Sequence, residues 1–126
     1  MKYFNKEEFC CKCCGGLPPS VRENIEALVE NVLDPAREKF GGPILVNSGY
    51  RCMANNPKVG GVQRSQHLRG EAADISCADN EHLAEILEQN GKYDQLIRYQ
   101  DALGDIRFIH VSWKRNGVNR KMKFNK

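Results

Sequence analysis

The stretch SQHLRGEAADISC, residues 65–77, combines two possible metal ligands with the start of a strand. His67 supplies an imidazole and Asp74 a carboxylate, at a spacing that is not helical, and Gly70 lies between them. Alternation in the second half of the stretch places Asp74 on one face of the predicted strand. Catalytic zinc usually takes three protein ligands and leaves its fourth position to water, so these two ligands need a third.

The third ligand has few candidates, because the sequence contains three histidines. His110 lies in a strand predicted over 106–113, where alternation places it on the same face as Ser112. A further strand is predicted over 93–99, and a hairpin-like connection joins the two. Asp74 and His110 can therefore project from neighbouring strands onto a common face.

The remaining histidine, His82, follows several acidic residues in the first turn of a helix predicted over 80–90. The helix has an apolar inner face, and Gly91 comes directly after its end. Charged helix starts of this kind are usually solvated, so we expect His82 to be exposed rather than a ligand.

An amphipathic helical segment is predicted nearer the N-terminus. Ser20 and Glu23 have the spacing of a capping box, and apolar residues recur at helical spacing over 25–40. Pro35 should kink this helix or begin a second one after a break. We expect this helical segment to serve packing rather than function, and a short buried strand over 43–48 follows it.

Length and composition indicate one globular domain over 1–126, with a Cys-rich segment at 1–16 and a basic tail at 114–126. The formal net charge of +3 is too small to indicate nucleic-acid binding, and we expect the tail to be solvated surface, with a wall polymer or nucleic acid as open alternatives. No apolar run has the length of a membrane span, and the first residues lack a signal-peptide core, so synthesis in the cytoplasm is expected. Residues 52–66 have the composition of a long loop, which we interpret as a wall of the substrate site.

Four of the six cysteines crowd into five positions: Cys10, Cys11, Cys13 and Cys14. Two interleaved C-x-x-C spacings result, but Cys52 and Cys77 do not form the second pair that a structural zinc site needs. We interpret the cluster as thiols of a reducing compartment, with a local disulfide or a structural metal as open alternatives.

Four short motifs occur in a fixed order along the chain: SGYR at 48–51, S-x-H-x-x-G-x-A-x-D at 65–74, DQLI at 94–97 and HVS at 110–112. Together they resemble the zinc D-alanyl-D-alanine carboxypeptidase family, whose fold is shared with the hedgehog signalling domain. The chain is more narrowly similar to short phage- and prophage-associated members that cleave peptidoglycan stem peptides. The resemblance implies an α+β fold, with a small, mainly antiparallel sheet and helices packed on one side.

The resemblance also implies site residues. It carries the zinc ligands onto His67, Asp74 and His110, a donor set that leaves the metal net positive and able to acidify water. Taken singly, these residues could instead be a loop cap, a turn cap and a core histidine. Arg51 matches the family arginine that contacts substrate near the reacting carbonyl. Ser65, Gln66 and Ser112 are expected to bind substrate backbone or to orient the ligands.

The general base departs from the family pattern. Family members often have a carboxylate three residues before the last histidine, where this chain has Arg107. Of the carboxylates that could reach the zinc water, Asp105 is the first choice, with Asp101 and Glu71 as alternatives.

The expected activity is zinc-dependent hydrolysis of peptidoglycan peptide by a monomer, as a DD- or LD-carboxypeptidase or an endopeptidase, acting on the wall after release or delivery. The alternative is a catalytically silent zinc module that binds wall peptide or a protein partner.

Overall fold

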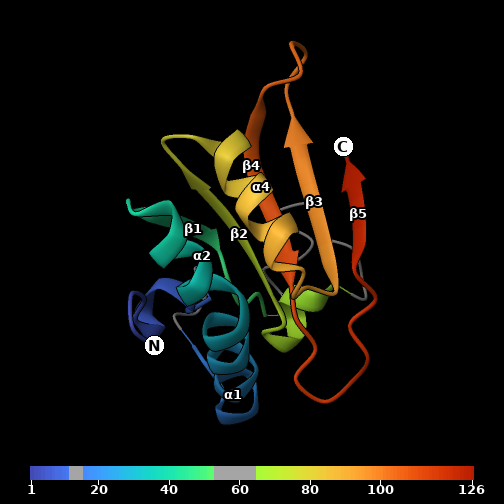
Figure 1. The fold of residues 1–126 in the computed structure, drawn as a ribbon. Helices are drawn as coiled ribbons and strands as arrows, with labels where there is room; N and C mark the ends of the chain where they lie inside the picture. The colour runs from blue at the N-terminus through green and yellow to red at the C-terminus, as the bar shows by residue number, and fades with distance from the viewer. Residues whose placement is uncertain (12–15, 53–64) are drawn as a thin grey trace.

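A five-stranded sheet forms the centre of the molecule in this computed structural model, which describes residues 1–11, 16–52 and 65–126 (Figure 1). Its strand order is β1-β2-β4-β3-β5, and every neighbouring pair is antiparallel except β3 with β5. The α+β class and the mainly antiparallel sheet predicted from the sequence are confirmed. The strands are β1 (Ile44–Ser48), β2 (Ala72–Cys77), β3 (Gln95–Gln100), β4 (Ile106–Ser112) and β5 (Met122–Asn125).

The predicted helices are present, with one difference at the start of the first. Helix α1 begins at Pro19, and no side chain caps it, so the capping box expected at Ser20 and Glu23 is absent. Proline suits the first turn of a helix because it has no N–H to leave unpaired there. The helical elements are η1 (Lys6–Phe9), α1 (Pro19–Leu28), the π-helical turn η2 (Val29–Leu33), α2 (Asp34–Phe40), η3 (Gln66–Arg69) and α4 (Asn80–Asn90).

Pro35 lies in the first turn of helix α2, directly after the π-helical turn η2, and the backbone stays helical through the junction, without the predicted break. Gly41 ends α2 with a φ of 75°, in the left-handed region that glycine adopts without strain. Helix α4 coincides with the predicted 80–90 segment, and His82 is exposed on it as expected.

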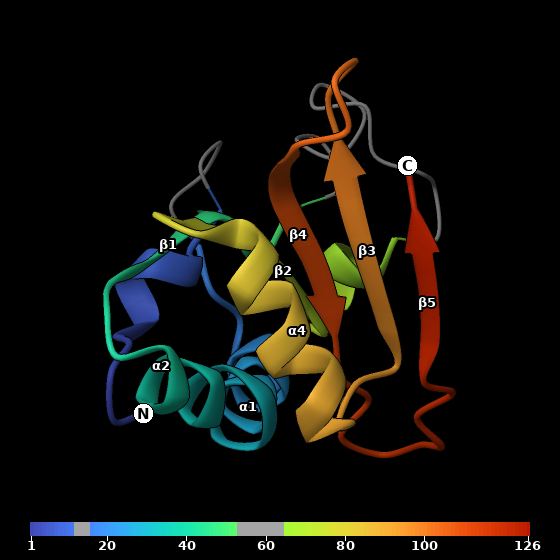
Figure 2. The ribbon, with the colours of Figure 1, turned by 45° about the horizontal axis from the view of Figure 1, so that its top comes forward.

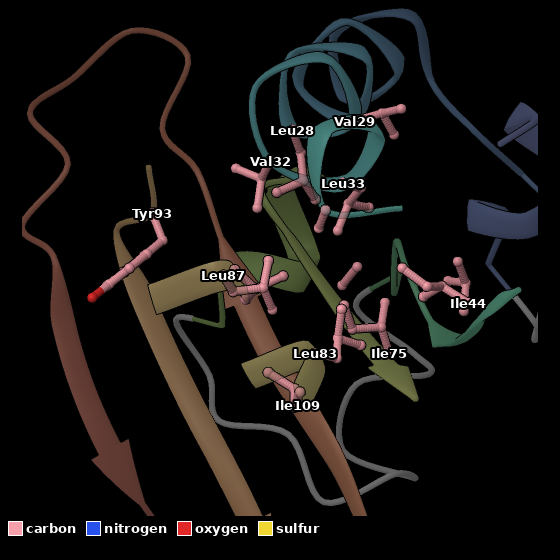
Figure 3. Packing of buried hydrophobic residues seen from close by; sticks show 14 of the residues in the cluster. Leu28, Val29, Val32, Leu33, Ile44, Ile75, Leu83, Leu87, Tyr93 and Ile109 are labelled. Carbon is pink, nitrogen blue, oxygen red and sulfur yellow. The ribbon is translucent and has the colours of Figure 1, made fainter. Parts of the chain in front are cut away.

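Helices α1, α2 and α4 pack on one face of the sheet, with α4 lying across β2, β4 and β3 (Figures 1 and 2). The core between them contains alternate strand residues, among them Ile75 of β2 and Ile109 of β4. Figure 3 shows side chains of α1 and η2, including Leu28 and Leu33, directed toward α4 and the strands. Burial of each such aliphatic side chain contributes about 1.5–3 kcal/mol.

Alternation directs the remaining strand side chains to the opposite face, which we call the site face. Asp74 of β2 and His110 of β4 belong to it, because their chain neighbours Ile75 and Ile109 lie in the core. The functional side chains thus share a rigid sheet with the core but project away from the helices.

The basic tail is more than a solvated surface. Its last part forms strand β5, which pairs with β3, and this strand was not predicted. Several of its cations pair with acids of the main body: Lys123 with Glu88 at 2.6 Å, and Arg115 with Glu23 at 3.2 Å. The edge of β3 and these paired acids supply the partners that a charge count cannot show.

The cysteine cluster and the long loop lie partly outside the described residues. Cys13, Cys14 and residues 53–64 fall there, so neither the C-x-x-C pairings nor the proposed substrate wall is tested. Within the described residues, the backbone N–H of Cys52 donates to Cys11 Sγ at 3.5 Å. No helix of the described segments is long and apolar enough to cross a membrane.

Candidate metal centre

His67 is positioned by the short helix η3, which lies between the loop after β1 and the start of β2. Ser65 begins this element, and its hydroxyl accepts a hydrogen bond from the His67 N–H at 3.2 Å. Gly70 ends it with a φ of 73°, and a Cβ there would lie 2.6 Å from a Val21 side-chain carbon. Glycine is therefore required at this turn for both its conformation and its size.

Asp74 and His110 face each other across two adjacent strands. Their Cα atoms are register partners in the β2/β4 pair, so both side chains leave the sheet on the site face. All three side chains are buried: His67, Asp74 and His110 are 2%, 7% and 8% exposed. The predicted meeting of Asp74 with His110 on neighbouring strands is confirmed.

The hydrogen bond that His67 makes to the backbone defines which ring nitrogen carries its hydrogen. His67 Nδ1 lies 2.7 Å from the carbonyl oxygen of Gly49, which can only accept, so Nδ1 must donate. In the neutral ring Nε2 then carries a lone pair, and it points at Asp74 Oδ1 from 3.2 Å. Two acceptors facing each other at this distance require a proton or a cation between them.

The same carboxylate oxygen also faces the second imidazole, with His110 Nδ1 at 3.1 Å from Asp74 Oδ1. Burial lowers the pKa of His110, which favours its neutral ring. Burial raises the pKa of Asp74, but the contacts of its carboxylate with the His110 and His67 rings outweigh it and hold the pKa well below its usual range. An ionised carboxylate thus faces two nitrogen atoms that are available as ligands.

The geometry of these atoms fits a metal ion. One ligand atom from each of His67, Asp74 and His110 lies within 4.8 Å of the others. Two ligands at about 2.0–2.1 Å from a tetrahedral zinc ion lie about 3.3 Å apart, close to the two nitrogen–oxygen distances here. The other ring nitrogen of His110, Nε2, is buried without a hydrogen-bond partner. Two nitrogens and one carboxylate oxygen form a donor set suited to catalytic zinc.

Comparison with known proteins agrees with this donor set. A model of the family described as Peptidase M15 matches residues 2–112, which is most of the chain. The chain belongs to the Peptidase M15 family. This confirms the resemblance to the zinc D-alanyl-D-alanine carboxypeptidases, and it makes the chain a member of a family of zinc-dependent peptidases. A search of curated proteins found no match.

Arg51 is the second charged group of the site in this M15 family member. Its Nη2 lies 3.0 Å from Asp74 Oδ2, and its Nε donates to Ser48 Oγ at 3.1 Å. Its backbone N–H donates to the His67 carbonyl at 3.0 Å, which ties the segment after β1 to η3. The structure therefore brings Arg51 together with the three candidate ligands.

The three residues expected to touch substrate are all buried. Ser65 caps His67, while Gln66 Nε2 donates to Asp94 Oδ2 at 3.0 Å. Ser112 is fully buried, and its hydroxyl accepts from the Gln95 N–H at 3.0 Å. Of the three, Ser65 contacts a candidate ligand, whereas the contacts of Gln66 and Ser112 go to Asp94 and Gln95; a direct contact of any of them with substrate stays a prediction.

Asp105, the predicted general base, lies in the exposed turn between β3 and β4. Its N–H donates to the Asp101 carboxylate at 3.0 Å, so both acids belong to this turn. His110 lies five positions after Asp105 along the strand, a distance of about 16 Å at 3.3 Å per position. Glu71 pairs with Arg69 at 2.7 Å. The structure does not bring any of these three carboxylates into the metal group.

Sequence reasoning missed the role of Asp94, the first residue of the DQLI motif. Its buried carboxylate accepts three hydrogen bonds from Arg120, and Lys114 lies 3.7 Å away. The signal was present, because an acid directly before a buried strand requires partners and the tail is rich in cations. What the pattern could not show is that the tail turns back onto β3.

Proposed function

We propose that this M15 family member is a zinc peptidase that hydrolyses a peptide bond in the stem peptides of peptidoglycan. The observation that carries the proposal is the convergence of His67 Nε2, His110 Nδ1 and Asp74 Oδ1, with the lone pair of the His67 ring directed at an ionised oxygen. Family membership supports peptide hydrolysis. The stem peptide is inferred from the four motifs, which are most similar to wall-cleaving members.

The residues would divide the chemistry between them. His67, Asp74 and His110 would hold zinc, which supplies Lewis acidity toward a peptide carbonyl and acidifies water. Gly49 holds the His67 ring in the required tautomer through its carbonyl. Arg51 neutralises the outer oxygen of Asp74 and presents positive charge beside the site, where a substrate carboxylate or a developing oxyanion would be stabilised.

We propose in addition that the protein acts as a monomer on the cell wall after release or delivery, as phage- and prophage-associated relatives would. The pairing of tail cations with Asp94, Glu88 and Glu23 supports the expectation that nucleic acid is not the partner. Where the scissile bond lies in the stem peptide is left to the substrates tested below.

The test is incubation of purified protein with muropeptides, with and without zinc, followed by separation of the products by mass. Zinc-dependent loss of a terminal D-alanine would indicate a carboxypeptidase, and an internal cut would indicate an endopeptidase. A His67→Ala variant serves as the control that lacks one proposed ligand. If no stem peptide is cleaved at any zinc concentration, the enzymatic proposal is wrong.

A silent zinc module that binds wall peptide is the second candidate. Two observations favour it: Arg107 occupies the position of the family carboxylate, and Asp105 lies in an exposed turn. Such a module would bind zinc and muropeptide without turnover. Calorimetric binding of a muropeptide to zinc-loaded protein, in the absence of product, would favour this candidate over the peptidase.

A further inference from the structure

Tyr99 lies on the site face beside the metal group, although neither the motifs nor the family match assigns it a role. In the β3/β4 pair, Ile97 is the register partner of His110, and Tyr99 is the partner of Phe108. Residues two apart on a strand share a face, so Tyr99 and His110 project to the same side. Diagonal neighbours of this kind lie about 7–8 Å apart, within reach of a long aromatic side chain.

The Tyr99 ring is fixed in orientation by contacts on its faces. It stacks on Phe108 with centroids 4.4 Å apart and planes inclined by 12°. The ammonium of Lys126 lies 5.9 Å from its centroid. Lys126 is itself anchored, since its N–H donates to the Arg98 carbonyl at 2.8 Å and its carbonyl accepts from Gln100 at 2.7 Å. A phenol held in this way needs little reorganisation to act.

The charges of the metal group act on this phenol. Burial raises the pKa of Tyr99, the Asp74 carboxylate raises it further, and Arg51 partly opposes the rise. The hydroxyl therefore keeps its hydrogen at neutral pH. Among the described residues it makes no hydrogen bond to another side chain, so it is available as a donor.

We propose that the Tyr99 hydroxyl donates a hydrogen bond to the oxygen of the scissile carbonyl as negative charge develops there, opposite the charge of Arg51. This role rests on the proposed peptidase function and adds a second catalytic residue to it. A neutral donor suits this task because it strengthens its hydrogen bond as the oxygen becomes charged.

The test is the zinc-loaded Tyr99→Phe protein, which loses the hydroxyl and keeps the ring that stacks on Phe108. We expect kcat on the muropeptide cleaved by the wild type to fall about 10–10³-fold, the cost of removing one oxyanion donor, with KM within twofold. A phosphinate analogue of the cleaved bond should lose affinity by a similar factor, while an uncleaved substrate analogue should bind equally well. The matched control is Tyr3→Phe, a partly exposed tyrosine near Arg37.

Zinc content and the thermal midpoint of Tyr99→Phe should equal those of the wild type. Three results would overturn the role: unchanged kcat, a rise in KM alone, or loss of zinc or of folding, which would make the hydroxyl structural. If the proposed peptidase function is wrong, the wild-type protein itself will cleave no muropeptide. This outcome is distinct from a failure of the Tyr99 role alone.

Discussion

Asp74 and Asp94 are both buried carboxylates with pKa values below the usual range, yet they are surrounded by different kinds of partner. Asp74 faces two imidazole nitrogens through one oxygen and a single guanidinium through the other. Asp94 receives hydrogen bonds from Arg120 and Gln66, all of which are donors whatever the pH. The Asp74 carboxylate needs a bound cation to satisfy its surroundings, whereas the Asp94 carboxylate already has enough hydrogen-bond donors.

The two carboxylates therefore contribute to different properties of the protein: Asp94 to stability and Asp74 to metal binding. A buried acid with enough donors stabilises the structure, and here it attaches the tail to β3. A buried acid that faces the lone pair of an imidazole is stabilised fully only when a cation is added, which is what a binding site requires. Matched substitutions at the two positions should separate stability from metal binding.

The largest effect is expected from Asp74→Asn. Loss of the charged ligand should weaken zinc binding roughly 10²–10³-fold, about one ligand's share of the binding free energy of a zinc site. The zinc-induced rise in thermal midpoint should disappear with it. Stability without metal should fall as well, because the nearly buried Arg51 loses the carboxylate that it pairs with. Competition with a zinc-sensitive dye measures the affinity, and wild-type affinity in the variant would show that Asp74 is not a ligand.

Asp94→Asn should lower stability without weakening zinc binding. Arg120 and Lys114 would lose the charge that holds them, at a cost of about 2–3 kcal/mol, below the 3–5 kcal/mol of a fully buried pair because both cations are partly exposed. Zinc affinity should stay within about threefold of the wild type, since no ligand changes. Urea unfolding in the presence of a chelator gives the first quantity and dye competition the second. A large loss of zinc affinity with normal stability would reverse the assignment.

The same contrast shows what the sequence could and could not predict. Period-2 alternation located Asp74 and His110 on facing strands, and helical periodicity located α4, because both patterns are local. The partners of Asp94 come from residues 114 and 120, and this pairing depends on the tail folding back as β5. A short tail that folds back onto a distant strand leaves no periodic pattern in its own sequence when it is rich in lysine and arginine. Asp105 lies far from the site for a related reason. It is close to His110 in the sequence, but the extended strand between them sets their distance.

Acid should remove the contribution of Asp94 in a defined range. Burial raises the pKa of this carboxyl, but Arg120 and Gln66 outweigh it, and the pKa in the folded protein is about 2. A lowered folded pKa gives stability that is present above the unfolded pKa, near 4, and lost as pH falls toward 2, with a maximum of about 2 kcal/mol. The difference in unfolding free energy between wild type and Asp94→Asn should therefore shrink between pH 5 and about pH 2. Chelator-treated samples measured at several pH values check this, and a constant difference would contradict it.

The smallest effect is expected at Gln66, which lies between the two regions. Its amide N–H donates to Asp94, while its chain neighbour His67 is a candidate ligand. Gln66→Leu should cost about 1 kcal/mol, one buried hydrogen bond, and weaken zinc binding at most about tenfold through the position of His67. The cost is limited because Gln66 Oε1 is buried without a partner, and leucine removes that unsatisfied atom too.

A double-mutant cycle with Asp94→Asn decides whether the bridge couples the two carboxylates. If Gln66 acts through Asp94, the two stability losses should be non-additive by about 0.5 kcal/mol or more. If the losses add, Gln66 supports His67 independently of Asp94. The Asp74 and Asp94 carboxylates then act separately on the same sheet. In that case, substitutions in the tail near Asp94 would leave zinc affinity unchanged. If Gln66 instead couples Asp94 to His67, such substitutions would also change zinc affinity.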